Sequence, residues 1–120
     1  MTISNDIKLV TFINVFTVKP ANQQRLVDLL AHATVASVRH APGFVSSTLL
    51  RSVDGTKVAM YAQWRTREDY QAMRDNPASK EYLQDVLAIA KFEPGIYEIV
   101  ESYLPDDKGT RDETHPTLMQ

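Results

Sequence analysis

The chain has 120 residues, of which 43% are hydrophobic and 23% are charged, a composition typical of a soluble globular protein. Its formal net charge of -2 gives no electrostatic reason to expect nucleic acid or an anionic membrane as a partner. The absence of cysteine excludes disulfides and thiolate chemistry. The N-terminus has no signal-peptide core, and no segment approaches the roughly 20 apolar residues that a membrane helix needs. We therefore expect a cytoplasmic protein.

The first predicted strand covers residues 8–18 and is β-branched and aromatic on both faces. At the strand period of two, one face holds Val10, Phe12, Asn14, Phe16 and Val18. Asn14 therefore places an amide among apolar side chains. Residues 20–22 indicate a helix start, and leucine and alanine then recur at helical spacing until residues 41–43 end the helix near His40.

A hairpin and a capped helix follow. The second predicted strand covers residues 44–53, and Asp54-Gly55 is typical of a two-residue β-hairpin turn. The third strand, residues 58–64, ends on Trp64, the only tryptophan of the chain. Thr66 followed by Asp69 resembles a capping box, which predicts a short helix over residues 67–75.

The remaining elements are a second piece of helix and a last strand. Asn76-Pro77 predicts the start of a helix that extends to about Lys91, with Ala90 on its apolar side. Pro94-Gly95 predicts a turn, and residues 96–104 a strand. Residues 105–120 are mostly polar and lack periodicity, so we expect a flexible tail unless a partner chain holds it.

The predicted order is β-α-β-β-α-β, which is an α+β, ferredoxin-like fold over residues 1–104, with an antiparallel sheet and helices on one face. Helices on one side cover only one face of a sheet. The strands nevertheless carry apolar residues on the second face, among them Ile13, Val15 and Tyr61. This predicts a homodimer in which two sheets pack face to face.

Three residues are the main candidates for a site. Trp64 lies at a strand end beside a helix start, so it is either a core aromatic or a pocket wall that stacks a flat substrate. Asn14 either bonds to backbone or donates to a substrate oxygen in the same pocket. Tyr70, on the capped helix, packs in the core or positions a phenolic substrate. Further candidates to line the pocket are Phe12, Phe16, Met60, Met73 and Tyr82.

Other chemistry has no sequence support. His32, His40 and His115 share no metal-ligand spacing and lie near no carboxylate cluster, so no metal site is predicted. The chain has no glycine-rich phosphate loop, no Gly-x-Ser-x-Gly and no paired-carboxylate signature. These absences disfavour an enzyme that uses a metal, a nucleotide or a covalent nucleophile.

Short motifs between Lys8 and Tyr103 resemble the antibiotic biosynthesis monooxygenase family, the dimeric α+β barrels. The motifs are residues 16–20, residues 42–44, the Asp54-Gly55 turn, and Tyr61-Ala62-Gln63-Trp64 followed by Tyr70. The last of these looks especially like the cofactor-free oxygenases of aromatic polyketide pathways. The resemblance implies that Trp64 is the pocket tryptophan and Tyr70 the helix tyrosine. It also matches Asn14 to an asparagine that heme-degrading members use.

Two departures from the family pattern bear on the reaction. Polyketide oxygenases that oxidise anthrones have an asparagine four residues before the tryptophan, and Met60 stands at that position here. Heme-degrading members ligate iron through a histidine on the helix after the tryptophan, and residues 67–75 and 77–91 contain none. The heme function is therefore disfavoured, and the polyketide function lacks one catalytic amide.

The function predicted from these observations is a homodimeric, cofactor-independent monooxygenase that oxidises a phenolic, quinol or anthrone-like molecule with dioxygen. Trp64 would stack the substrate, Asn14 would orient a substrate oxygen, and Tyr70 would donate a hydrogen bond. Phe12, Phe16, Met60 and Met73 would form the apolar lining. Two alternatives stay open, a non-oxidative isomerase of a small enolisable metabolite and a non-catalytic module that binds a small aromatic molecule.

Overall fold

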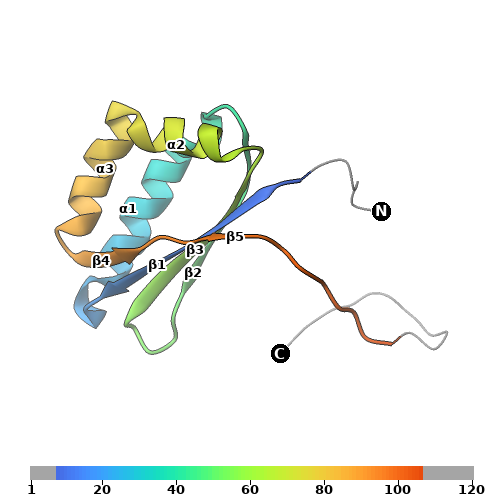
Figure 1. Ribbon diagram of the computed structural model, residues 1–120. Coiled ribbons are helices and arrows are strands. Elements are labelled where there is room, and N and C mark those ends of the chain that lie inside the picture. Colours follow the sequence, from blue (N-terminus) through green and yellow to red (C-terminus); the bar gives the residue numbers. More distant parts are fainter. Residues whose placement is uncertain (1–7, 107–120) are drawn as a thin grey trace.

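The computed structural model describes residues 8–106 of the chain. Its sheet is built around β1 (Val10–Val18), whose β-branched and aromatic residues favour extended backbone. β1 lies between β3 (Lys57–Trp64) and β4 (Ala90–Glu93), and β2 (Phe44–Arg51) pairs with the outer side of β3. The order β2-β3-β1-β4, with these pairings antiparallel, confirms the predicted ferredoxin-like arrangement (Figure 1).

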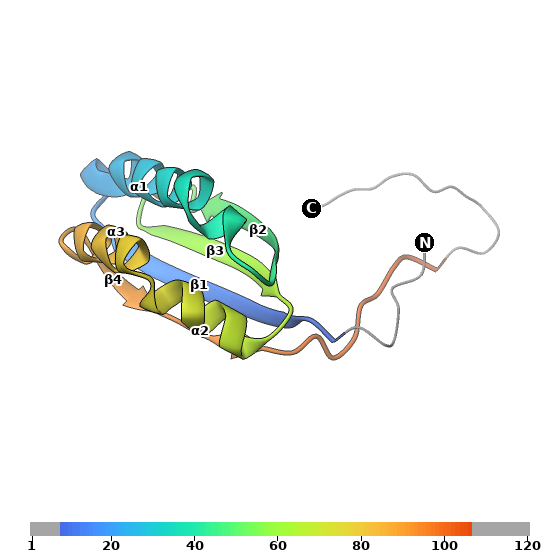
Figure 2. The ribbon, with the colours of Figure 1, turned by 90° about the horizontal axis from the view of Figure 1, so that it is seen from above.

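The helices lie on one face of this sheet, as Figure 2 shows. They are the 3-10 turn η1 (Pro20–Asn22), α1 (Gln23–Ala36), the 3-10 turn η2 (Val38–His40), α2 (Arg67–Asp75) and α3 (Pro77–Leu87). α1 buries Leu26, Leu30 and Ala33, which recur at helical spacing. No helix among residues 8–106 is both long and apolar enough to cross a membrane.

Side-chain caps fix the starts of α2 and α3. The Thr66 hydroxyl oxygen accepts a hydrogen bond from the backbone N–H of Asp69 at 2.9 Å, which confirms the predicted cap of α2. The Asn76 side chain likewise accepts from the backbone N–H of Ala78 at 2.8 Å, and Pro77 occupies the first turn of α3. The Thr66 cap thus starts α2 directly after β3, the strand that ends on Trp64.

The connection between β2 and β3 is longer than the predicted two-residue turn. β2 ends at Arg51 and β3 begins at Lys57. The Gly55 N–H donates to the Ser52 carbonyl at 3.2 Å, so the tight turn has Val53 and Asp54 at its centre, one position before the predicted pair. Gly55 has a φ of +85°, and the Asp54 carboxylate accepts hydrogen bonds from Ser52 and Thr56. The antiparallel pairing that the turn predicted is present.

The C-terminal elements differ most from prediction. The predicted helix begins at Pro77 as expected, but its predicted end at Lys91 is wrong, because α3 ends at Leu87 and Ala90 already begins β4. The predicted strand over residues 96–104 is confirmed only at its start: β5 (Ile96–Tyr97) pairs with β1, and the predicted extension to residue 104 is wrong. β4 forms because the second edge of β1 is free, and Phe92 pairs with Phe16 there.

Beyond β5, residues 98–106 extend away from the sheet (Figure 1). Their apolar side chains are exposed, namely Ile99, Val100, Tyr103 and Leu104. Most of the predicted tail, residues 107–120, lies outside the described residues, so the expectation of a flexible tail stays a prediction.

The helix-facing side of the sheet carries two clusters of buried residues. One cluster contains Phe16, Val18, Leu26, Leu30, Val58 and Val86. The other contains Phe12, Ala62, Trp64 and Tyr70, and it lies where β1 and β3 meet α2. We call the second group the aromatic cluster. It contains the tryptophan and the tyrosine that the sequence singled out.

Candidate active site

Trp64 ends β3 inside the aromatic cluster and is 1% exposed. The strand period turns it toward the helices, together with Ala62. Its indole meets the ring of Phe44 edge-on, with centroids 5.4 Å apart, and that of Tyr70 in the same way at 5.8 Å. Trp64 is thus held by aromatic neighbours on two sides.

Tyr70 connects α2 to the strands below it. The cap at Thr66 sets the start of α2, and one turn later the Tyr70 side chain turns into the aromatic cluster, where it is 8% exposed. Its ring stacks on Phe12 of β1, with centroids 3.7 Å apart and 17° between the planes. The packing fixes where the phenolic oxygen lies.

Asn14 is a buried amide between Phe12 and Phe16 on the helix-facing side of β1, and it is 8% exposed. Its Nδ2 donates a long hydrogen bond of 3.4 Å to the Tyr70 hydroxyl. Its Oδ1 is buried and has no hydrogen-bond partner in the part of the chain that the structure describes. An unpartnered polar atom in such a place costs stability, so it marks a site that a ligand or water would complete.

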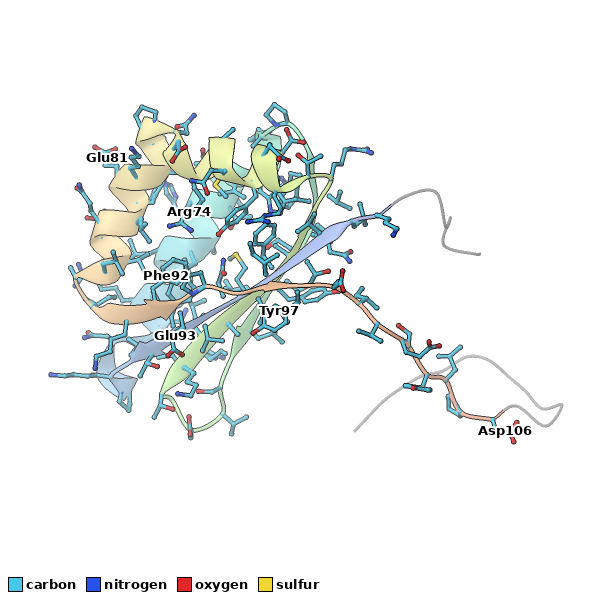
Figure 3. The ribbon with its side chains drawn as sticks, viewed as in Figure 1. Arg74, Glu81, Phe92, Glu93, Tyr97 and Asp106 are labelled. Atoms are coloured by element: carbon cyan, nitrogen blue, oxygen red, sulfur yellow. The ribbon has the colours of Figure 1, made fainter. Side chains whose placement is uncertain are left out.

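Arg74, which the sequence analysis did not assign to the site, also contacts Tyr70. Its Nη1 donates to the Tyr70 hydroxyl at 3.0 Å, and its guanidinium lies 5.8 Å from the centroid of that ring. It also lies 5.2 Å from the centroid of Phe92 on β4 (Figure 3). In the sequence, Arg74 follows Tyr70 by four residues, a spacing that puts both side chains on one face of α2.

A cavity of about 810 Å³ lies along one side of α2. Phe12, Tyr70 and Arg74 line it, and residues 94–96 close its far side. Its volume is that of a pocket for a small organic ligand. The stacked rings of Phe12 and Tyr70 and the side chain of Arg74 therefore line a cavity large enough for a flat molecule.

A second cavity of about 540 Å³ lies along α2 and the end of α1. Met73 lines it together with Asp69 and His40. Met73 also packs against the aromatic cluster and accepts a hydrogen bond from the Ser79 hydroxyl at 3.4 Å. Trp64 lines neither cavity, and its contact with Tyr70 connects it to the first.

Three other predicted lining residues lie apart from the aromatic cluster. Phe16 belongs to the other cluster, and Met60 packs against it. Met60 is nevertheless the cross-strand partner of Asn14 in the pairing of β1 with β3. Tyr82 on α3 contacts His32 of α1, with ring centroids 5.6 Å apart, and lines neither cavity.

The described residues hold no group of three or more histidine, cysteine, aspartate or glutamate side chains that could bind a metal ion. The polar groups that meet at Tyr70 are instead its own phenol, the Asn14 amide and the Arg74 guanidinium. These three are hydrogen-bond donors suited to orienting an oxygen and stabilising negative charge on it.

The fold and this site define a ferredoxin-like protein with an aromatic, donor-lined cavity between α2 and residues 94–96. The profile of the family described as antibiotic biosynthesis monooxygenase matches residues 9–85 of the chain. Tetracenomycin-F1 monooxygenase of Streptomyces glaucescens is 38% identical over 102 residues, which cover 85% of this chain and 91% of that protein. The chain belongs to the antibiotic biosynthesis monooxygenase family and is a monooxygenase.

Solved structures show the same fold. The monooxygenase from the gene ActVA-Orf6 of Streptomyces coelicolor, in complex with Nanaomycin D, matches with a TM-score of 0.71 and 28% identity. The match covers 86% of this chain and 96% of that one. SnoaB, a cofactor-independent oxygenase from Streptomyces nogalater, matches with a TM-score of 0.68 and 28% identity over 82% of this chain and 99% of its own.

Proposed function

We propose that this chain is a cofactor-independent monooxygenase that oxidises a phenolic, quinol or anthrone-like molecule with dioxygen. The observation that carries the proposal is the buried Asn14 amide, which has an unpartnered oxygen and touches a tyrosine that lines the large cavity. SnoaB, a cofactor-independent oxygenase, and tetracenomycin-F1 monooxygenase support it by their similarity to this chain.

In the proposed reaction the substrate supplies the electrons. An anthrone-like substrate loses a proton, and its carbanion forms a carbon–oxygen bond with dioxygen to give a peroxide. Loss of the second proton from that carbon breaks the oxygen–oxygen bond, and a carbonyl and one water result. The protein excludes water, orients the ring and stabilises the negative oxygen of the ionised substrate.

The chain's own residues divide these tasks. Phe12 and Tyr70 present their stacked rings to the cavity, and Trp64 supports Tyr70 from the side. The Asn14 amide, which lines neither cavity and contacts the Tyr70 hydroxyl, orients a substrate oxygen. Met60 occupies the position where anthrone-oxidising relatives have an asparagine, as the resemblance implies. Asn14 is its direct cross-strand partner, so it can supply an amide at the same place in the sheet.

Oxygen uptake measured with a panel of quinols and anthrones tests the proposal. We expect uptake with at least one compound, and a large loss of turnover in Trp64→Phe and Asn14→Ala. Val53→Ser, in the exposed hairpin connection, is the control and should leave uptake unchanged. Unchanged turnover in both site variants would contradict the assigned roles, and turnover without dioxygen would indicate an isomerase instead.

We further propose that the chain works as a homodimer. The side of the sheet opposite the helices carries Ile13, Val15, Ala59 and Tyr61, all half-buried, and beside them an exposed Leu50. Residues 98–106 add a row of exposed apolar side chains. A second copy packed on this open face would cover an apolar surface that is too large for a monomer.

Light scattering at micromolar concentration tests the dimer. Leu50→Glu places a charge on the open face and should give a monomer. The control, Val35→Glu, places the same charge at an equally exposed position on α1 and should stay dimeric. A wild-type monomer at that concentration would contradict the proposal.

A further inference from the structure

Arg74 is a half-buried cation without a counter-charge among the described residues. Its guanidinium packs between the rings of Tyr70 and Phe92, and one of its N–H groups is used in the hydrogen bond to the Tyr70 hydroxyl. A guanidinium has five N–H donors in a planar fork, so donors remain for a ligand. The cavity beside α2 is where such a ligand would sit.

The polar groups around Arg74 are also short of an acceptor. The Tyr70 oxygen accepts hydrogen bonds from both Arg74 and Asn14, and no acceptor for its own proton lies among the described residues. Turning the Asn14 amide over would let Tyr70 donate to its oxygen, but would then leave the buried NH₂ without an acceptor. In either arrangement a donor is left over, the Tyr70 hydroxyl proton or the Asn14 NH₂, which suits a ligand oxygen that accepts hydrogen bonds. In the first arrangement the Asn14 oxygen is also free to accept from a ligand, so the preference for a negative charge comes from Arg74.

The other charged groups nearby do not cancel this preference. Arg67 and Glu68 are exposed and line the same cavity, so its charged lining consists of two arginines and one glutamate. Lys91 and Glu93 flank Phe92 on β4, but strand alternation turns both to the opposite face, where they are exposed. The cavity thus has a net positive lining, with its most buried charge at Arg74.

We propose that Arg74 binds the anionic oxygen of an ionised aromatic substrate in this cavity, with the Tyr70 hydroxyl as a second donor. The protein would then take the phenolate or enolate form in preference to the neutral one, the substrate's proton passing to water. This inference rests on the proposed oxygenase function and deepens it, because it assigns the group that makes the electron-rich form of the substrate available to dioxygen.

Alizarin, a tricyclic dihydroxyanthraquinone, is a suitable probe because its colour reports its ionisation and its central ring is already oxidised. Absorbance titration should show that the pKa of bound alizarin in the wild type is lowered, so that the phenolate binds about tenfold or more tightly than the phenol. Arg74→Gln should abolish the shift, and Arg74→Lys should restore part of it, because lysine keeps the charge but not the fork. A purely structural role for Arg74 would not move this pKa.

Arg25→Gln is the matched control. It removes the same charge from an exposed position on α1, outside both cavities, and should leave the pKa of bound alizarin unchanged. Arg74→Met, which keeps apolar packing on Phe92 but not the charge, should behave like Arg74→Gln. An unchanged pKa in folded Arg74→Gln and Arg74→Met, no lowering in the wild type, or no binding of alizarin would overturn the proposal.

The two proposals can fail separately. Oxygen uptake with an anthrone combined with no shift in the pKa of bound alizarin overturns the role of Arg74 and leaves the oxygenase function intact. A shift that depends on Arg74, without oxygen uptake from any compound in the panel, supports the anion site and contradicts the oxygenase function.

Discussion

The ring of Tyr70 lies flat on the ring of Phe12, with centroids 3.7 Å apart and an angle of 17° between the planes. Trp64 meets the same tyrosine edge-on, and Asn14 and Arg74 both donate to its hydroxyl oxygen. The ring of Tyr70 is therefore fixed by packing, and its oxygen by polar contacts. The two contributions can be separated by removing one atom.

Tyr70→Phe removes the hydroxyl and keeps the stacked ring. We expect the variant to fold with the same near-ultraviolet circular dichroism, and kcat for oxygen uptake to fall about 100-fold, as when one preorganised donor is removed. Tyr97→Phe is the control, because it deletes the same atom from a half-exposed tyrosine on β5. A kcat within twofold of wild type in Tyr70→Phe would show that the hydroxyl does not contact the reacting substrate.

Gly43, directly before β2, lies close to Asp69 of α2. It has a φ of +86°, and a Cβ added there would overlap the Asp69 side chain. Gly55 has nearly the same φ, +85°, but an added Cβ would lie 3.3 Å from Pro20, a contact that a small shift relieves. Comparing an alanine substitution at each glycine therefore separates the cost of a positive φ from the cost of steric overlap.

We expect Gly55→Ala to lower the free energy of unfolding by about 1–2 kcal/mol through its φ alone. Gly43→Ala should cost at least about 1 kcal/mol more, because the overlap with Asp69 adds to the same strain. Urea unfolding measures both. In an Asp69→Gly background, which removes the overlapping Cβ as well as the carboxylate, Gly43→Ala should cost no more than Gly55→Ala. Equal losses in the two single variants would show that Asp69 moves aside freely.

The elements near Trp64 were predictable because their signals are local. The period of two along β3 and the pair of Thr66 and Asp69 act within a few residues, and no distant contact overrides them. The end of α3 was not predictable in this way. Residues 90–93 form a strand because β1 has a free edge and Phe92 stacks on Phe16, contacts that no sequence period records.

The candidate site was predicted in part for the same reason. Strand alternation turned Asn14 inward, and the helical cap placed Tyr70, so their meeting followed from two local patterns. Arg74 lies four residues after Tyr70, but spacing does not tell which arginine of α2 turns toward the sheet. That depends on Phe92, which was expected just beyond a helix and lies instead on a strand.

The carboxylate of Asp54 stabilises the connection between β2 and β3 in a pH-dependent way. Hydrogen bonds from the side chain and backbone of Thr56 and from the Ser52 hydroxyl lower its pKa from an ordinary 3.8 to about 2. Because the folded pKa is depressed, the contribution to stability is present above pH 3.8 and is lost as the pH falls to about 2.

Titration of the Asp54 carboxyl carbon by nuclear magnetic resonance should give a midpoint near pH 2. Thr56→Val removes the hydroxyl, the largest cause of the shift, and should move the midpoint upward. Asp54→Asn should make the melting temperature less dependent on pH between 2 and about 4. A wild-type midpoint near 3.8 would show that the hydrogen bonds do not persist in solution.

Asn14→Leu separates stability from function at the centre of the site. The wild-type amide makes one long hydrogen bond to Tyr70 and leaves its oxygen unpartnered among apolar side chains. The Tyr70 oxygen keeps its hydrogen bond from Arg74, so an apolar side chain of similar shape at position 14 leaves no new unpartnered atom and removes the desolvation cost of the amide. We therefore expect the free energy of unfolding to stay unchanged or rise by about 1 kcal/mol, while oxygen uptake is lost.

The matched variant is Gln23→Leu, which removes another buried amide. Gln23 donates to the backbone carbonyls of Ser52 and Lys57 at 3.0 Å each, so its removal breaks two hydrogen bonds, although both carbonyls keep a backbone donor. Gln23→Leu should lower the free energy of unfolding by about 1–3 kcal/mol and leave kcat unchanged. Urea unfolding and oxygen uptake on both variants give the comparison. A loss of stability in Asn14→Leu as large as that in Gln23→Leu would mean that Asn14 is retained for the fold and not for a substrate.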